Sequence, residues 1–285
     1  MGRTSKDKRD IYYRLAKEQG WRARSAFKLL QINEQFNLFN RVTKVVDLCA
    51  APGSWSQVLS SRLSSATKIV AVDLQLMAPL PGVTQLQGDI TKLETAQQIV
   101  SYCEGLVDLV VCDGAPDVTG LHDMDEYVQG QLLLAALNIT THILRPEGSF
   151  VAKIFRGPDA DILFAQLGYF FAEVVCAKPA SSRNSSLEAF VVCRGYRPPQ
   201  GYIPSRLTEF IESGLDKTGS GWDAMHRKLV PFVACGDLSG YDSDKTYSLE
   251  EDYKWRDPLQ PPTVPPYRAA LERKRLNCRP QNDST

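Results

Sequence analysis

Four charged side chains interrupt otherwise apolar segments of the sequence. They are Lys28 in SAFKLL, Asp113 in VVCDGAPD, Lys153 in SFVAKIF and Glu188 in SSLEAFVV. A buried charge is costly unless an opposite charge neutralises it. A single lysine in a strand most often reaches water from a sheet edge, with only its stem packed. Two lysines and two acids on neighbouring elements could instead neutralise one another within one site.

A second candidate site begins with the stretch VVDLCAAPGSWSQVL, residues 45–59. Its apolar start, Val45–Leu48, predicts a buried parallel strand, and the AAPG turn leads into a helix that Ser54 could cap. Such a turn exposes backbone N–H groups, and Gly53 leaves room for a ligand because glycine has no Cβ. The turn lacks the G-x-G-x-x-G pattern of dinucleotide sites and the G-K-[ST] of phosphate loops. It therefore favours a smaller, non-phosphorylated cofactor, with an ordinary strand-to-helix turn as the alternative.

Four aspartates fall at or near predicted strand ends, where parallel sheets bind ligands: Asp47, Asp73, Asp89 and Asp113. Asp73 lies 20 residues beyond Gly53, the spacing at which a carboxylate can bind ribose hydroxyls. Asp89 could accept a hydrogen bond from an adenine amino group. Each acid alone could simply cap a loop. Because these aspartates and the glycine turn all follow predicted parallel strands, the set as a whole favours a nucleoside-binding site.

Strands and helices alternate between residues 44 and 195, which predicts an α/β fold with a mostly parallel, seven-stranded sheet and helices on both faces. The predicted strands are Val45–Leu48, Ile69–Val72, Val83–Gln87, Leu109–Cys112, Ser149–Ile154, Val174–Ala177 and Leu187–Cys193. The predicted helices are Arg22–Phe36, Trp55–Arg62, Leu93–Tyr102, Asp125–Leu144 and Asp159–Phe171.

Charge and composition divide the chain of 285 residues into three parts. The chain has no formal net charge, but residues 1–28 hold nine basic and three acidic side chains, so this end is strongly positive. Cations mixed with aromatic side chains suit a nucleic-acid backbone, although a solvated tail would look the same. We expect a basic RNA-contacting segment over 1–21, a catalytic domain over 22–200, and a partly disordered extension over 201–285. The extension is acidic and proline-rich, and its apolar island Val230–Val233 could dock on the domain or on a partner.

Cysteine usage points to a reducing compartment. The seven cysteines are scattered without a C-x-x-C pair, and there are only three histidines. This pattern favours reduced core residues over a disulfide framework or a zinc site, and we expect no bound metal. The basic start lacks the apolar core of a signal peptide, and no apolar run is long enough to span a membrane. We therefore expect a cytoplasmic protein, with the nucleus as a further location.

These motifs together resemble the FtsJ family of S-adenosylmethionine-dependent RNA ribose 2′-O-methyltransferases. The AAPGSWSQ loop, CDGAPD, AKIF and the strand that begins at Glu188 carry the resemblance over roughly residues 20–195, and the four charged residues match the family's Lys-Asp-Lys-Glu tetrad. The opening residues 2–32, APDVTGLHDMDEY, SSRNSS and VPFVACGDLSGYDSD are similar to the eukaryotic members that act on the tRNA anticodon loop. Cys49 and Ser54 stand where the common bacterial form has more glycine, which argues against a bacterial-type rRNA substrate.

The resemblance implies a Rossmann-like methyltransferase fold with S-adenosylmethionine as cofactor. Its cofactor contacts would be Gly53, Trp55, Asp73 at the ribose, Asp89 at the adenine, and Asp113. Lys153 would accept the proton of the ribose hydroxyl, or stay charged and stabilise the developing alkoxide. A free lysine has a pKa near ~10.4, so we expect burial or the nearby charge of Lys28 to lower it. Asp113 and Glu188 would orient the lysines.

The resemblance further implies methylation of the tRNA anticodon loop at nucleotides 32 and 34, and leaves open whether this chain modifies nucleotide 32, nucleotide 34 or both. Two helper proteins would select the nucleotide, a helical-repeat protein for 32 and a WD-repeat protein for 34. We expect RNA to approach over the basic N-terminal segment and the helix that bears Lys28, with contacts from Arg22 and Arg24. Two alternatives stay open, a 2′-O-methyltransferase for rRNA or an mRNA cap, and a non-catalytic RNA-binding relative.

Overall fold

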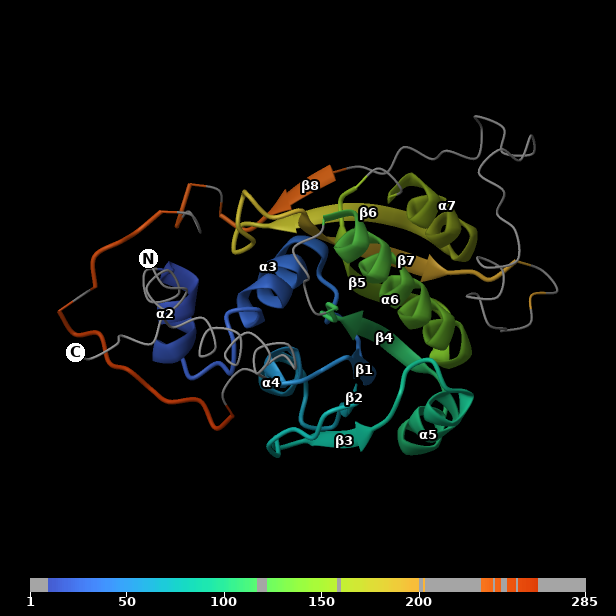
Figure 1. The fold of residues 1–285 in the computed structure, drawn as a ribbon. Coiled ribbons are helices and arrows are strands. Elements are labelled where there is room, and N and C mark those ends of the chain that lie inside the picture. Colours follow the sequence, from blue (N-terminus) through green and yellow to red (C-terminus); the bar gives the residue numbers. More distant parts are fainter. Residues whose placement is uncertain are drawn as a thin grey trace, which may run out of the picture.

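A sheet of eight strands forms the centre of the computed structural model (Figure 1). The structure describes residues 10–116, 122–157, 160–199, 202, 232–237, 239–241, 245–249 and 251–260. The described strands are β1 (Lys44–Leu48), β2 (Lys68–Asp73), β3 (Val83–Gln87), β4 (Val107–Cys112), β5 (Leu144–Phe155), β6 (Phe171–Pro179), β7 (Glu188–Tyr196) and β8 (Phe232–Cys235). Their spatial order is β3-β2-β1-β4-β5-β7-β6-β8.

Strand β1 lies between β2 and β4 and pairs with both in parallel. Its last four residues, Val45–Leu48, are all buried, as expected for a strand covered on both faces. The chain runs outward from β1 through β2 to β3 and then returns to β4 on the other side of β1. The carboxyl ends of β1 and β4 therefore flank a topological switch point, the place where open α/β sheets bind ligands.

Helices cover both faces of this sheet (Figure 1). Helices α5 (Leu93–Cys103), α6 (His122–Ile143) and α7 (Ala160–Phe170) pack on one face, and α3 (Ala26–Phe36) and α4 (Ser54–Arg62) on the other. Each face has its own apolar core, with Ile99, Leu137 and Leu167 in the first and Leu29, Trp55 and Phe190 in the second. No helix in the described part of the chain is long and apolar enough to cross a membrane.

The predicted α/β class, with a mostly parallel sheet between two helical layers, is confirmed, and all seven predicted strands are present. Strand β7 is the exception to the parallel arrangement, since it runs antiparallel to both β5 and β6. Strand β8 was not predicted as a strand. It contains the second half of the predicted apolar island, Phe232 and Val233, and pairs in parallel with β6, so this half docks on the domain through backbone hydrogen bonds. Residues 230 and 231 of the island lie outside the described residues.

The predicted helix Arg22–Phe36 is shorter than expected, because α3 begins at Ala26. An earlier helix, α2 (Ile11–Glu18), was missed. The carboxylate of Asp10 caps it by accepting a hydrogen bond from the backbone N–H of Tyr13 at 3.2 Å. Capping of this kind satisfies a backbone donor that the first helical turn leaves without a partner.

Helix α2 packs against a segment from the other end of the chain, drawn in orange and red in Figure 1. The hydroxyl of Tyr12 donates to the carbonyl of Tyr241 at 3.2 Å, and Arg14 donates to the carbonyl of Tyr247 at 2.7 Å. The rings of Tyr13 and Trp255 lie 6.2 Å apart. The basic N-terminal segment and the C-terminal extension therefore meet each other beside the catalytic domain.

The three predicted parts of the chain stay a prediction. Residues 1–9 of the basic segment lie outside the described residues, as do 203–231 and 261–285 of the extension, with most of its proline-rich run. Residues 117–121 of the APDVTGLHDMDEY motif also lie outside them.

Truncation of Phe150 tests the first apolar core. Its ring is fully buried on β5 and stacks on Phe171 at 6.1 Å. Replacing Phe150 with alanine should lower the free energy of unfolding by about 3–5 kcal/mol, because a buried cavity remains. Tyr169→Ala is the matched control, since this aromatic side chain on α7 is 51% exposed. Urea unfolding followed by circular dichroism measures both variants, and equal losses would contradict the assignment of this core.

Candidate active site

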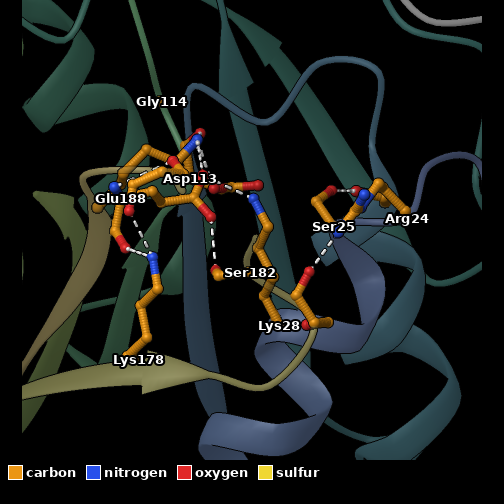
Figure 2. A network of polar contacts seen from close by, with 12 residues as sticks. Arg24, Ser25, Lys28, Asp113, Gly114, Lys178, Ser182 and Glu188 are labelled. Carbon is orange, nitrogen blue, oxygen red and sulfur yellow. Dashed lines mark hydrogen bonds and ion pairs between the residues drawn. The ribbon is translucent and has the colours of Figure 1, made fainter. Parts of the chain in front are cut away.

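The four charged residues that interrupt apolar segments lie together in one cluster (Figure 2). Lys28 extends from α3, Asp113 directly follows β4, Lys153 lies on β5 and Glu188 begins β7. The four side chains are between 8% and 16% exposed. Three strands and a helix thus bring two cations and two anions to the edge of the sheet where β1 and β4 end.

Two short ion pairs and a longer contact connect this tetrad. The amine of Lys28 lies 2.7 Å from Oε2 of Glu188, and the amine of Lys153 lies 2.7 Å from Oδ1 of Asp113. Lys153 also donates to the backbone carbonyl of Asp113 at 2.8 Å and lies 3.7 Å from Oε2 of Glu188. Glu188 is therefore shared by both lysines, and the tetrad is neutral as a whole.

The tetrad shifts the pKa values of its members in opposite directions. Burial alone would raise the pKa of Glu188, but the charges of Lys28 and Lys153 outweigh it and hold that pKa well below the ordinary range. Burial alone would lower the pKa of Lys153, but Asp113 and Glu188 outweigh it and raise that pKa above 10.5. The expectation that burial or Lys28 lowers the pKa of Lys153 is therefore wrong for the ligand-free protein. Both side chains are charged at neutral pH.

Three polar residues that the sequence analysis missed hold the tetrad in place. The hydroxyl of Ser182 donates to Oε1 of Glu188 at 2.6 Å (Figure 2). The buried Lys178 donates to the backbone carbonyls of Ser186 and Glu188, each at 2.7 Å. Gln129 of α6 donates to the carbonyl of Lys153 at 3.1 Å. Lys178 interrupts the apolar run of β6. A search for charged side chains within apolar segments, which identified the tetrad, would therefore have identified Lys178 as well.

The turn after β1 has a backbone conformation that favours glycine, but side chains of the protein itself occupy the space beside that glycine. Gly53 has a φ of 98°, a left-handed conformation that favours glycine, and its N–H donates to the carbonyl of Ala50 at 2.6 Å. A Cβ on Gly53 would lie 2.7 Å from an Arg22 nitrogen and 3.3 Å from Leu80, so the turn closely approaches its neighbours. Helix α4 begins at the next residue.

The other predicted cofactor residues differ in how available their side chains are. Asp73, at the end of β2, accepts from the backbone N–H groups of Ala51 and Gln75, each at 2.8 Å. Asp89 accepts from Thr91 through Oδ1 only, which leaves Oδ2 without a donor among the described residues. The indole of Trp55 is 2% exposed, packs on Phe190 and donates to a backbone carbonyl. Its backbone N–H in the first turn of α4 is thus the part left for a ligand.

These residues fit a nucleoside cofactor. Carboxylates follow β2, β3 and β4, and Gly53 lies at the first turn of α4 between them. Carboxylate oxygens suit the donors of ribose hydroxyls and an adenine amino group. The described residues hold no cluster of three or more histidine, cysteine, aspartate or glutamate side chains suited to a metal ion.

Arg22 and Arg24, the predicted RNA contacts, both have protein partners. Arg22 is 2% exposed and its guanidinium donates to three backbone carbonyls, so its placement does not support contact with RNA. Arg24 contacts the carboxylate of Asp10 and the carbonyl of Ser181, and its side chain is 20% exposed. The many cations near Arg22 and Arg24 in the sequence suggested an RNA surface and gave no indication of these protein partners.

Comparison with protein families points to one chemistry. A family model described as FtsJ-like methyltransferase matches residues 21–196, which include the whole tetrad and the Gly53 turn. A Plasmodium falciparum crystal structure described as a ribosomal RNA methyltransferase is similar in fold. Its TM-score is 0.56 at 22% identity, and the match covers 62% of this chain and 98% of the other.

Two relatives match nearly the whole chain. A mouse protein named tRNA (cytidine(32)/guanosine(34)-2′-O)-methyltransferase is 63% identical over 96% of this chain and 87% of its own length. A Drosophila melanogaster protein named tRNA (guanosine(34)-2′-O)-methyltransferase is 53% identical over 96% of this chain and 88% of its own length.

The buried Asp47 at the end of β1 makes stability depend on pH. Burial, reinforced by the charges of Asp113 and Asp73, raises its pKa from 3.8 to about 7, although a 2.6 Å hydrogen bond from Ser56 opposes the shift. The folded state therefore keeps a proton that the unfolded state releases, so stability falls as pH rises from about 4 to about 7. Asp47→Asn removes this titration. As pH rises over that range, the free energy of unfolding of Asp47→Asn should increase relative to that of the wild type by up to about 1.4 kcal/mol per pH unit.

Denaturant unfolding from pH 4 to pH 8 measures this difference. Ser56→Ala is the paired variant, since losing the hydroxyl donor should extend the decline of stability to higher pH. A difference between Asp47→Asn and the wild type that stays constant from pH 4 to pH 8 would contradict a raised pKa at Asp47.

Proposed function

The chain belongs to the FtsJ-like methyltransferase family, and from this premise we propose that it methylates the ribose 2′-hydroxyl of tRNA nucleotides 32 and 34, with S-adenosylmethionine as methyl donor. The observation that carries the proposal is the neutral Lys28-Asp113-Lys153-Glu188 cluster, which lies at the same edge of the sheet as the carboxylates Asp73 and Asp89. The names of both relatives support the tRNA substrate; the name of the mouse protein includes nucleotides 32 and 34, and that of the Drosophila protein includes nucleotide 34 alone.

The protein's own residues supply binding and alignment. Asp73 would hold the ribose of the cofactor and Asp89, through its free Oδ2, the adenine amino group. Gly53 and the backbone N–H of Trp55 would contact the methionine portion, and Asp113 would face the reacting centre. When bound, S-adenosylmethionine supplies a methyl group activated by a sulfonium. Since that activation comes with the cofactor, the protein mainly needs to hold the ribose hydroxyl in line with the methyl group.

Lys153 is the proposed proton acceptor. Formation of the O2′–methyl bond would accompany loss of the bond between the methyl group and the sulfonium sulfur, which would leave as a neutral thioether. The hydroxyl proton must leave too, and a neutral Lys153 amine would take it. The ligand-free tetrad disfavours that form because Asp113 and Glu188 raise the pKa of Lys153. A sulfonium cation bound nearby would oppose their effect, since a like charge favours the neutral amine. Asp113 and Glu188 would hold Lys153 in position.

The substrate RNA would approach over α3 and the basic N-terminal segment. Lys28 connects this surface to the tetrad, because it lies on α3 and pairs with Glu188. We further propose that helper proteins dock on the C-terminal extension and select the nucleotide, a helical-repeat protein for 32 and a WD-repeat protein for 34. A cytoplasmic location would fit the free thiols of Cys49, Cys103, Cys112, Cys176 and Cys193.

Methyl transfer to unmodified tRNA tests the function directly. Purified protein, with and without each helper, should transfer label from S-adenosylmethionine, and mapping should place it on the 2′-oxygens of nucleotides 32 and 34. Lys153→Met should lower the transfer rate by about 100-fold or more while the dissociation constant for the cofactor stays unchanged. The exposed Lys68→Met is the control and should transfer at the wild-type rate. Label on rRNA alone, or undiminished turnover by Lys153→Met, would contradict the proposal.

The pH profile separates the two roles of Lys153. The neutral fraction of the Lys153 amine grows about tenfold per pH unit at any pH below its pKa in the complex with cofactor and tRNA. The single-turnover rate at saturating cofactor and tRNA should therefore rise by about tenfold per unit from pH 6 to pH 8, until another step limits it. A flat profile over this range would instead favour a charged Lys153 that stabilises the alkoxide.

A further inference from the structure

Arg22 connects the two loops that flank the candidate cofactor site. Its Nη1 donates to the carbonyl of Pro52 at 2.9 Å, in the turn after β1. Its Nη2 donates to the carbonyls of Ala78 and Pro79 at 2.8 Å and 2.9 Å, in the loop after β2. Since β1 and β2 are adjacent parallel strands, these loops leave the same edge of the sheet. One buried guanidinium thus holds both walls of the site.

The charge of Arg22 is not neutralised by an acid. No described carboxylate lies within ion-pair distance of it, and burial alone lowers its pKa. Its Nε is also buried without a hydrogen-bond partner. A buried charge compensated only by carbonyl dipoles is a costly arrangement, and a neutral apolar side chain of similar size would often be more stable. The arrangement therefore suggests a role other than stability.

The contact of Arg22 with Gly53 locates that role at the cofactor turn. A Cβ on Gly53 would come within 2.7 Å of the Nη1 atom, so the guanidinium lies directly against the turn. The backbone of Arg22 is held in place as well, because its N–H donates to Oε1 of Gln57 at 3.0 Å. Gln57 belongs to α4, and its amide in turn donates to the carbonyl of Gly20 at 2.9 Å.

Other hydrogen bonds hold the two ends of the loop after β2: Gln87 donates to the carbonyl of Leu74 at 2.9 Å, and Ser60 of α4 donates to the carbonyl of Pro81 at 2.6 Å. The carbonyl of Ala78 also accepts from the side-chain amide of Gln85 at 2.9 Å, and the backbone N–H of Ala78 donates to Oε1 of Gln260 at 2.5 Å. Leu74 and Leu76, in the same loop, are 66% and 78% exposed. Without Arg22, the start of this loop would stay joined to the turn through Asp73, which accepts from Ala51 and Gln75. Its middle, at Ala78 and Pro79, would lose its hydrogen bonds to the Gly53 side of the site.

We propose that Arg22 is a positioning residue for the cofactor, which sets the separation of the Gly53 turn and the loop of residues 74–82. This inference rests on the proposed function, since it presumes that the cofactor lies between these loops. It also replaces the RNA contact first expected of Arg22. Removing the guanidinium should loosen the cofactor's binding site without touching the tetrad or the RNA surface.

Cofactor and tRNA affinities, measured separately, test the proposal. In Arg22→Met, the dissociation constant for S-adenosylmethionine by calorimetry and the KM for it should rise about tenfold, the factor that about 1.4 kcal/mol produces. The kcat at saturating cofactor should stay within about twofold, and the tRNA dissociation constant and its salt dependence should not change. Arg22→Lys keeps the charge but has fewer donors, so its cofactor affinity should fall between those of Arg22→Met and the wild type.

Arg41→Met is the matched control. This exposed arginine precedes β1, at the opposite end of that strand from the cofactor turn, and its loss changes the net charge equally. It should bind the cofactor as the wild type does. If Arg22→Met does not fold, the decision rests on Arg22→Lys, whose cofactor affinity should be at least about threefold weaker than that of the wild type.

Three results would overturn the inference. Cofactor affinity equal to that of the wild type in a folded Arg22 variant would show that the loops do not need the guanidinium. A loss of tRNA affinity with a smaller salt dependence would return Arg22 to the RNA surface. A wild-type protein that binds no S-adenosylmethionine would instead overturn the proposed function, and this inference with it.

Discussion

Mutual neutralisation of four buried charges is the constraint on which the site depends. Lys28, Asp113, Lys153 and Glu188 come from four elements, and a charge buried at this depth is costly without an opposite charge beside it. The positions of the four side chains must therefore match closely. Two further residues fix Glu188: the hydroxyl of Ser182 donates to its carboxylate, and Lys178 donates to its backbone carbonyl. The surrounding apolar strands raise the cost of any misplacement.

The order of the strands explains how four distant segments meet. The chain leaves the centre of the sheet through β2 and β3 and returns beside β1 as β4, which opens a crevice at the carboxyl ends of both strands. Strand β7 is inserted antiparallel between β5 and β6, so its first residue, Glu188, lies beside the last residues of β5. This reversal places an acid from the start of one strand next to a lysine near the end of another.

Much of the fold and the tetrad could be predicted because both depend on contrast within the sequence. Apolar strands alternate with amphipathic helices, and a charge in an apolar run stands out. Ser182 lies in a polar loop and Arg22 in a basic segment, so neither differs from its neighbours, and their partners are backbone carbonyls or distant acids that no local pattern encodes. The four residues of β8 were missed because a short edge strand depends on the strand it joins.

The raised pKa of Lys153 and its proposed role as a base are compatible if the site is completed by its ligands. In the ligand-free protein, two carboxylates face two ammonium groups, which favours a charged Lys153. A cofactor that brings its own positive charge would turn a neutral cluster into a cationic one. The easiest way for a buried, cationic cluster to regain neutrality is to lose a proton, and among the tetrad only the lysines carry one to lose. Cofactor binding would thereby prepare the neutral amine only where the methyl group is already present.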